Sequence, residues 1–86
     1  KNQITTLLNK IVYTIPKEVQ LTEIKNEEKG GKQHIYISAQ SKKYEQLAYF
    51  KAKLRNANIL DNVTSNEGTN SGDVVTTIIE GDLRNY

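Results

Sequence analysis

The feature that most constrains the fold is an order of patterns that occurs twice in 86 residues. A stretch with the apolar spacing of a helix is followed by two shorter stretches in which apolar and polar residues alternate, and then the same order returns. Alternating stretches form half-buried strands, and a helix with one apolar side must cover a sheet. The repeat therefore predicts the order α-β-β-α-β-β in a single domain.

The first helix should run from about residue 2 to residue 14. Its apolar residues recur at intervals of three and four, which places them on one side of a helix: Ile4, Leu7, Leu8, Ile11, Val12 and Ile15. Pro16 disfavours the α conformation of the residue before it, so we expect the helix to stop near Thr14.

A hairpin should follow the first helix. Residues 19–22 alternate as a strand does, and Ile24 breaks the phase, which predicts a bulge near Glu23. The charged residues 26–32 include Gly30 and Gly31 and predict a turn. The returning strand, residues 34–39, then has two faces: one with Ile35, Ile37 and Ala39, the other with His34, Tyr36 and Ser38.

A second helix is expected after Ser41, which is a natural N-cap residue. Tyr49 should face solvent, and Asn56 and Asn58 are suited to a helix end because Asn tolerates the left-handed conformation. Its inner side should carry an apolar stripe, with Tyr44 and Lys51 at the margin. The stripe consists of Leu47, Phe50, Leu54 and Ala57.

Two more strands complete the repeat. Residues 59–65 form a weaker strand centred on Val63, residues 66–72 form a polar turn, and residues 73–80 form the last strand. Adjacent apolar residues in that strand point to both faces, which suits a central position in the sheet.

These elements predict an α+β fold, a two-layer sandwich with two helices on one face of a four-stranded antiparallel sheet. A right-handed crossover would place the second and fourth strands in the middle. The arrangement is a circularly permuted ferredoxin-like fold. The predicted core consists of Leu7, Leu8, Ile11, Leu21, Ile35, Ile37, Leu47, Phe50, Leu54 and Val63.

The composition narrows the classes of function. Twelve basic and ten acidic residues are mixed along the chain, which does not predict the basic stripe of a nucleic-acid-binding protein. Cysteine is absent, so there is no disulfide framework and no thiolate metal site. No apolar run reaches the roughly 18–20 residues of a membrane helix. Methionine is also absent, so we expect residues 1–86 to be one domain excised from a longer protein.

No constellation along the chain predicts catalysis or a cofactor. His34 is the single histidine and has no evident orienting partner, so we expect a surface position. The charges of residues 27–32 flank a turn and predict solvation, and Gly30 and Gly31 lack the sequence of a phosphate loop. The aspartates lack the spacing of a calcium loop.

Two activities known on similar folds are disfavoured. RNA-recognition modules stack bases on two or three aromatic residues of the central strands, whereas Tyr36 is alone on that face. An acylphosphatase-like enzyme needs an arginine in a phosphate-binding loop, whereas Arg55 lies late in a helix and Arg84 lies near the end of the chain.

Residues 15–24, "IPKEVQLTEI", and residues 35–63, "IYISAQSKKYEQLAYFKAKLRNANILDNV", resemble the membrane-distal domain of PilN-type fimbrial assembly proteins. The resemblance extends over about residues 4–80. Ser38 and Ala39 depart from the pattern, because the family commonly has glycine there. The positions that fill the pattern are Pro16, Val19, Leu21, Thr22, Ile24, Ile35, Ile37, Phe50, Leu54 and Val63.

This resemblance implies a structural subunit of the type IV pilus machine or a related type II secretion system. Such a protein is a single-pass protein of the cell membrane, and this domain lies outside the cytoplasm after a membrane helix and a coiled coil. The expected partners are a second copy, a PilO-like subunit of similar fold and other pilus-assembly proteins. The family implies no catalytic residues and no cofactor.

Two alternatives remain at this stage: another α-β-β-α-β-β interaction module, of BON-like or sporulation ring-building type, and a nucleic-acid-binding domain. If the chain is a PilN-like scaffold, the bare face of the sheet and the outer side of the second helix are the expected contact surfaces. The candidate interface residues are Tyr36, Tyr49, Val74 and Ile78, with Val75 and Ile79 as the alternative pair from the last strand.

Overall fold

A computed structural model describes residues 3–66 and 68–84, apart from the side chains of residues 3–5, 7 and 8. The predicted core positions Leu7 and Leu8, and Ile4 of the same stripe, lie outside the described side chains. The elements follow the predicted order with one addition: α1 (Gln3–Tyr13), β1 (Gln20–Lys29), β2 (Lys32–Ser41), α2 (Tyr44–Asn56), β3 (Leu60–Ser65), β4 (Thr69–Ser71) and β5 (Val74–Leu83).

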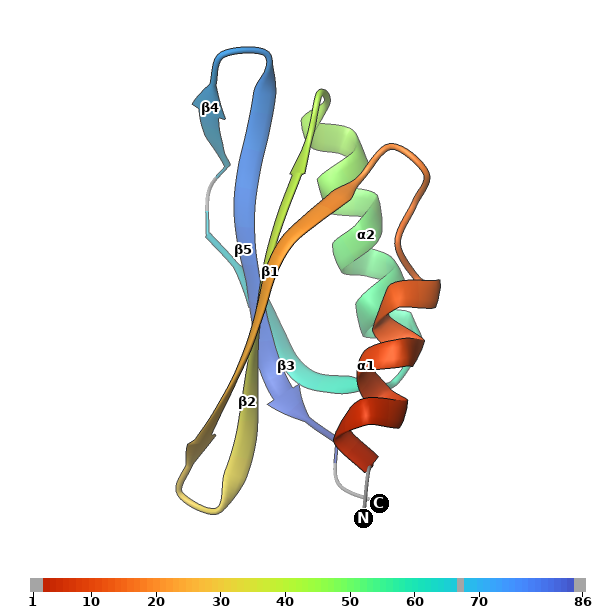
Figure 1. The fold of residues 1–86 in the computed structure, drawn as a ribbon, viewed down its shortest axis with the longest axis vertical. Coiled ribbons are helices and arrows are strands. Elements are labelled where there is room, and N and C mark those ends of the chain that lie inside the picture. The colour runs from red at the N-terminus through yellow and green to blue at the C-terminus, as the bar shows by residue number, and fades with distance from the viewer. Residues whose placement is uncertain (1–2, 67, 85–86) are drawn as a thin grey trace.

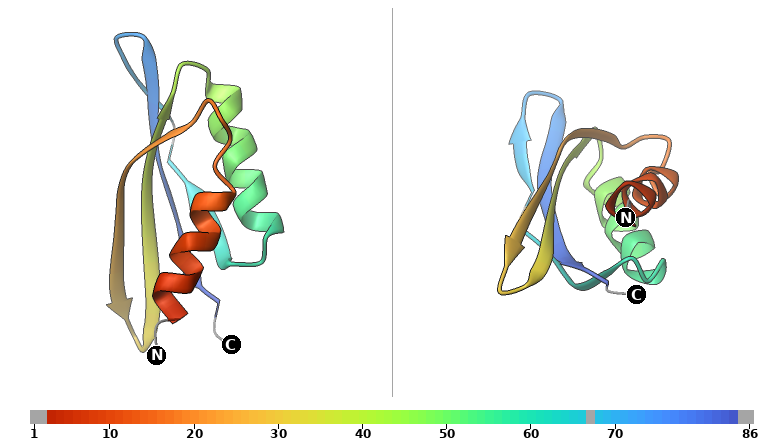
Figure 2. Two further views of the ribbon diagram at one scale, coloured as in Figure 1. Left: turned by 45° about the vertical axis from the view of Figure 1, so that its right-hand side comes forward. Right: turned by 60° about the horizontal axis from the view of Figure 1, so that its bottom comes forward.

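The fold is an α+β sandwich of two layers. Both helices lie on one face of an antiparallel sheet, and the other face is bare (Figures 1 and 2). The strand order is β1-β2-β5-β3, so the strands that end each half of the repeat lie in the middle, as predicted. The sheet has five strands and not four, because the short β4 also pairs with β5.

The segment 66–72 is not the simple polar turn that the sequence predicted. β3 pairs with β5 as far as Ser65, the ladder is then interrupted, and β4 resumes pairing at Thr69 opposite Thr76. The side chain of Asn66 fills the interruption, since its Oδ1 accepts hydrogen bonds from the Ile78 N–H at 2.9 Å and from Thr77 Oγ1 at 2.9 Å. The Asn66 side chain thus accepts the hydrogen bond of a β5 N–H group between the residues of β5 that pair with β3 and those that pair with β4.

The β1–β2 hairpin is longer than predicted. Lys29 pairs with Lys32, and only Gly30 and Gly31 form the loop, with φ of 56° and 82°. Positive φ at both loop residues is the geometry that matches the twist of a two-residue hairpin, and glycine adopts it without strain. The predicted bulge is confirmed, because the register shifts between Leu21 and Glu23.

The helix boundaries show one wrong prediction. α1 ends at Tyr13, close to the predicted position, and Asn58 has the expected left-handed conformation with φ of 59°. Ser41, however, does not cap α2. It is the last residue of β2, buried and paired with Val75, and the N-cap is Lys43, which has no side-chain capping bond. The strand continues to Ser41 because β5 offers it a partner.

The core between the layers follows most of the predicted positions. Ile11, Ile35, Ile37, Leu47, Phe50 and Leu54 are buried, while Leu21 and Val63 are partly buried at its border. Two residues of the predicted apolar stripes lie elsewhere: Val12 is 51% exposed, and Ala57 is exposed beyond the end of α2. The core also includes Val19, Ala39, Ile59, Leu60 and Ile79.

Candidate protein-interaction surface

The bare face of the sheet is mostly polar. The alternation of β2 and β5 turns Ile35, Ile37 and Ile79 to the helices, and the neighbouring residues to solvent. The register then groups on this face the side chains of Glu23, Lys25, Glu27, Lys29, His34, Tyr36, Ser38, Val74, Thr76, Ile78, Glu80 and Asp82. Ile78, at 39% exposure, is the large apolar residue of this set that is exposed.

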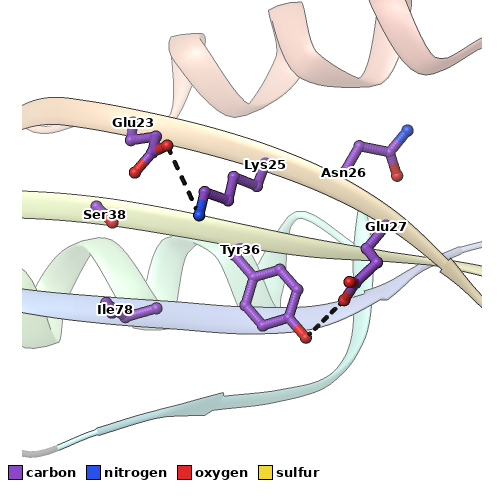
Figure 3. Close-up of a pocket in the computed structure, with 7 residues that line it drawn as sticks. All are labelled: Glu23, Lys25, Asn26, Glu27, Tyr36, Ser38 and Ile78. Atoms are coloured by element: carbon purple, nitrogen blue, oxygen red, sulfur yellow. Dashed lines mark hydrogen bonds and ion pairs between the residues drawn. The ribbon is translucent and has the colours of Figure 1, made fainter.

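A shallow groove of about 510 Å³ crosses the middle of this face, where Tyr36 and Ile78 meet the residues of β1 (Figure 3). Tyr36 is held in place there, since its hydroxyl accepts a hydrogen bond from Lys29 Nζ at 2.9 Å and donates to Glu27 Oε1 at 3.2 Å. The bond to Tyr36 also raises the pKa of Lys29. The groove is therefore walled by a fixed aromatic ring. Its lining is Glu23, Lys25, Asn26, Glu27, Tyr36, Ser38 and Ile78.

The four predicted interface residues do not form one patch. Tyr36 and Ile78 line the same groove. Val74 lies at the start of β5, in a separate polar hollow next to Ser41 and Lys43. Tyr49 belongs to the other layer, on α2, where it is 55% exposed. Of the two alternative pairs from the last strand, Val74 and Ile78 face away from the helices, while Ile79 is buried and Val75 packs against the core.

His34 contradicts the expectation of an unpartnered surface residue. Its side chain is 18% exposed, and both ring nitrogens meet carboxylates of β5: Nδ1 lies 2.9 Å from Asp82 Oδ1, and Nε2 lies 2.8 Å from Glu80 Oε1. Its ring also contacts Tyr36 edge to face, with centroids 4.7 Å apart. The imidazole therefore ties β2 to β5 on the bare face and supports the ring of Tyr36.

These contacts change the acidity of the groups. The hydrogen bonds that His34 donates to Asp82 and then to Glu80 raise the pKa of His34 above 6.5. The hydrogen bond from His34, followed by that from Asn62, lowers the pKa of Asp82 below 3.8. The cluster is thus most favourable when the imidazole is protonated and the carboxylates are ionised.

We expect this cluster to make stability depend on pH. A raised histidine pKa contributes stability that is complete below pH 6.5 and is lost as the pH rises through the higher folded-state value. The lowered pKa of Asp82 contributes above pH 3.8 and is lost as the pH falls through the lower folded-state value. The wild-type protein should therefore exceed His34→Gln in free energy of unfolding most between pH 3.8 and pH 6.5.

Urea unfolding of both proteins from about pH 4 to about pH 9 measures this difference. Lys17→Gln, which changes an exposed residue between α1 and β1, is the control and should leave the pH profile unchanged. A difference between wild type and His34→Gln that stays constant over the range would contradict the assignment.

The sequence missed this cluster because Asp82 lies beyond the predicted end of the last strand at residue 80. β5 continues to Leu83, which places Asp82 opposite His34 and Glu80 opposite Tyr36. The available signal was the alternation of Ile79, Gly81 and Leu83 with Glu80 and Asp82, which continues the two-faced pattern.

The described residues contain no group of three or more His, Cys, Asp or Glu side chains that could hold a metal ion. Within residues 3–66 and 68–84, no helix is long and apolar enough to cross a membrane. What the bare face presents is a groove with a fixed tyrosine, one isoleucine and charges of both signs. Such a surface suits the binding of another protein.

Comparison with known proteins agrees with this view of the chain. The family model described as fimbrial assembly protein (PilN) matches residues 6–76. Among curated proteins, none is a significant match. The periplasmic domain of EpsL from Vibrio parahaemolyticus has a similar structure, with a TM-score of 0.71 and 19% identity, over 93% of this chain and 89% of that one. The periplasmic domain of XcpY has a TM-score of 0.67 and 13% identity, over 92% of this chain and 99% of that one. The two structures share the fold, and the family match extends over most of the chain, so the chain belongs to the PilN family of fimbrial assembly proteins.

Proposed function

We propose that this chain is the extracytoplasmic domain of a single-pass membrane protein that helps to build the inner-membrane assembly complex of type IV pili or of a related type II secretion system. It acts as a non-enzymatic scaffold. Its partners are a second copy of itself, a PilO-like subunit of similar fold, or both, together with other assembly proteins.

One observation carries this proposal. The PilN family match covers residues 6–76, and the same residues fold like two periplasmic domains over nearly their whole lengths. The composition of the bare face supports a binding role, because its side chains are tied to one another and not arranged around a reacting group. His34, which would be the natural general base, has both nitrogens occupied by carboxylates.

The groove at Tyr36 and Ile78 is the surface that we assign to the protein partner. Tyrosine is enriched at the centres of interfaces because it offers a large apolar ring and a polar tip. Here the ring is already fixed by Lys29, Glu27 and His34, so little side-chain entropy is lost on binding. Tyr49 on the opposite layer is the competing surface.

Substitution of each tyrosine by serine tests this assignment. Sedimentation of the isolated domain at several hundred micromolar, alone and with a PilO-like subunit, should show association that is weak, about micromolar or poorer, because a membrane anchor would supply effective concentration in the intact protein. Tyr36→Ser should weaken it, and Tyr49→Ser should not.

Urea unfolding of both variants controls for loss of fold, since an interface substitution should leave the unfolding midpoint unchanged. A strictly monomeric domain that also fails to bind a PilO-like subunit would contradict the proposal. Weakening by Tyr49→Ser alone would move the contact to the helix layer.

A further inference from the structure

Charge is distributed unequally between the two layers, although the whole chain is nearly balanced. The five strands contain six acidic and three basic residues. The two helices and the two residues before α2 contain one acidic residue, Glu45, and six basic ones: Lys10, Lys42, Lys43, Lys51, Lys53 and Arg55. Because both helices lie on one side of the sheet (Figure 2), the fold places an excess of positive charge on that side.

The cations of the two layers also differ in their surroundings. On the sheet side, Lys25 lies 3.9 Å from Glu23, Lys29 lies 3.7 Å from Glu27, and Arg84 lies 2.6 Å from Asp61. On the helix side, no described carboxylate lies within 4.0 Å of the five basic residues in and before α2: Lys42, Lys43, Lys51, Lys53 and Arg55. Among the described residues, no carboxylate therefore neutralises their positive charge by an ion pair.

The shape of α2 leaves these charges accessible. Leu47, Phe50 and Leu54 are buried, so the opposite side of the helix carries the exposed residues Ala48 and Ala52. Helical geometry places longer side chains on both sides of these alanines. Lys51 and Arg55 share one side, and Tyr49 and Lys53 share the other, with Lys53 Nζ 5.4 Å from the centre of the Tyr49 ring.

Exposed aromatic residues accompany the cations. Tyr44 and Tyr49 of α2 are 52% and 55% exposed, and Tyr13 at the end of α1 is 87% exposed. We call the exposed surface of α2, with Lys42 and Lys43 at its start, the basic helix face. It is convex, because it is the outer side of a helix. It has Ala48 and Ala52 in the middle, long basic residues at the borders and one acidic residue, Glu45.

We propose that the basic helix face binds the surface of a membrane rich in anionic phospholipid. The five cations are spread along α2 and do not converge on one hollow, since Lys42 and Lys43 line one and Lys51 lines another. A spread row of cations matches an extended layer of negative head groups better than it matches a small anion. Each lysine or arginine near such a surface contributes about 1 kcal/mol, and tyrosine rings are favourable at the level of the head groups.

This inference rests on the proposed function, which puts the domain next to a membrane. It also assigns different tasks to the two layers. The helix layer faces lipid, and the bare face of the sheet, with the Tyr36 groove, faces a protein partner. A single domain can then hold both contacts at once, because the two surfaces lie on opposite sides of the sandwich (Figure 1).

Co-sedimentation of the 86-residue chain with vesicles tests the inference. At low salt we expect binding to vesicles rich in phosphatidylglycerol and none to vesicles of phosphatidylcholine. Binding should fall steeply as salt is raised, because the Debye length shortens to about 3 Å at 1 M salt. The triple variant Lys51→Gln, Lys53→Gln, Arg55→Gln should bind about a hundredfold more weakly.

A matched control carries the same loss of charge on the other layer: Lys25→Gln, Lys29→Gln, Lys32→Gln. It should bind phosphatidylglycerol vesicles as wild type does, and circular dichroism checks that both triple variants are folded. Equal weakening by the two triple variants, or binding to neither type of vesicle, would overturn the inference.

Single-stranded DNA tests the other class of polyanion. If DNA competes fully with the vesicles and binds more tightly at the same salt concentration, the basic helix face is a nucleic-acid site and the lipid assignment is wrong. The sedimentation of Tyr36→Ser, which reports on the bare face of the sheet, is independent of these results. Failure of lipid binding therefore does not count against the scaffold proposal.

Discussion

Phe50→Ala is expected to lower the free energy of unfolding by about 3–5 kcal/mol. Phe50 has no exposed surface and is the largest fully buried side chain among the described residues. It lies in the middle of α2, where the helix meets the sheet. Truncation to alanine removes the ring from the core and leaves a cavity that the surrounding strands cannot close without losing their own packing. A domain of this size buries little surface, so this loss is a large share of its total stability.

Urea unfolding at low protein concentration, where association is negligible, measures this loss. Tyr49→Ala is the control, because it truncates the neighbouring aromatic residue at an exposed position. The control should change the free energy of unfolding by less than about 1 kcal/mol. If Phe50→Ala and the control unfold at the same denaturant concentration, Phe50 is not a core residue.

Gly81→Val should be destabilising by about 1–3 kcal/mol or more through overpacking. Gly81 pairs with Ile35 in the middle of the sheet, and its missing side chain points toward the helices. A Cβ atom there would lie 3.0 Å from the backbone oxygen of Asp61 and 3.1 Å from the Cβ of Leu60. Relief of this contact requires β3 to move away from β5, which strains the ladder between them.

Thermal unfolding of Gly81→Val beside Thr76→Val separates this steric effect from the general effect of valine in β5. Thr76 points to the bare face of the sheet, so Thr76→Val adds no contact with β3. We expect a lower midpoint for Gly81→Val alone. An unchanged midpoint would show that β3 can yield at this point without cost.

Local patterns were sufficient to predict much of the fold. The three-and-four spacing of Leu47, Phe50 and Leu54, and the alternation of Ile35 and Ile37, each depend on one stretch of chain and correctly gave the buried sides. The left-handed Asn58 and the bulge after Leu21 were likewise predicted from residues close in sequence.

Features that depend on pairing between distant residues were not predictable in this way. Ser41 has the chemistry of an N-cap, but β5 lies beside it and extends the strand. Asn66 has the chemistry of a turn, but it fills a gap opposite Thr77 and Ile78. His34 has no partner within its own strand, and the carboxylates that contact it belong to residues that lie 46 and 48 positions later in the chain.

The candidate site was predicted in part for the same reason. The sequence placed Tyr36 on the bare face and left two apolar pairs open for the last strand, Val74 with Ile78 or Val75 with Ile79. The register turns the first pair to the bare face, and of that pair Ile78 lines the groove with Tyr36. The imbalance of charge between the layers is also a consequence of the fold, because residues of both signs alternate along the chain and are separated only when strands and helices form different surfaces.

The interruption at Asn66 has a consequence for the way in which copies of this domain can associate. An exposed edge strand favours edge-to-edge aggregation when a strand of another molecule can pair with it along an unbroken length. Here one edge changes from β3 to β4 at the gap and is kinked again at Asn62, whose φ is 57°. The other edge, β1, carries a bulge and alternating Glu and Lys residues. Neither margin offers a long regular template, so crowding of these domains should bring faces together without seeding fibres.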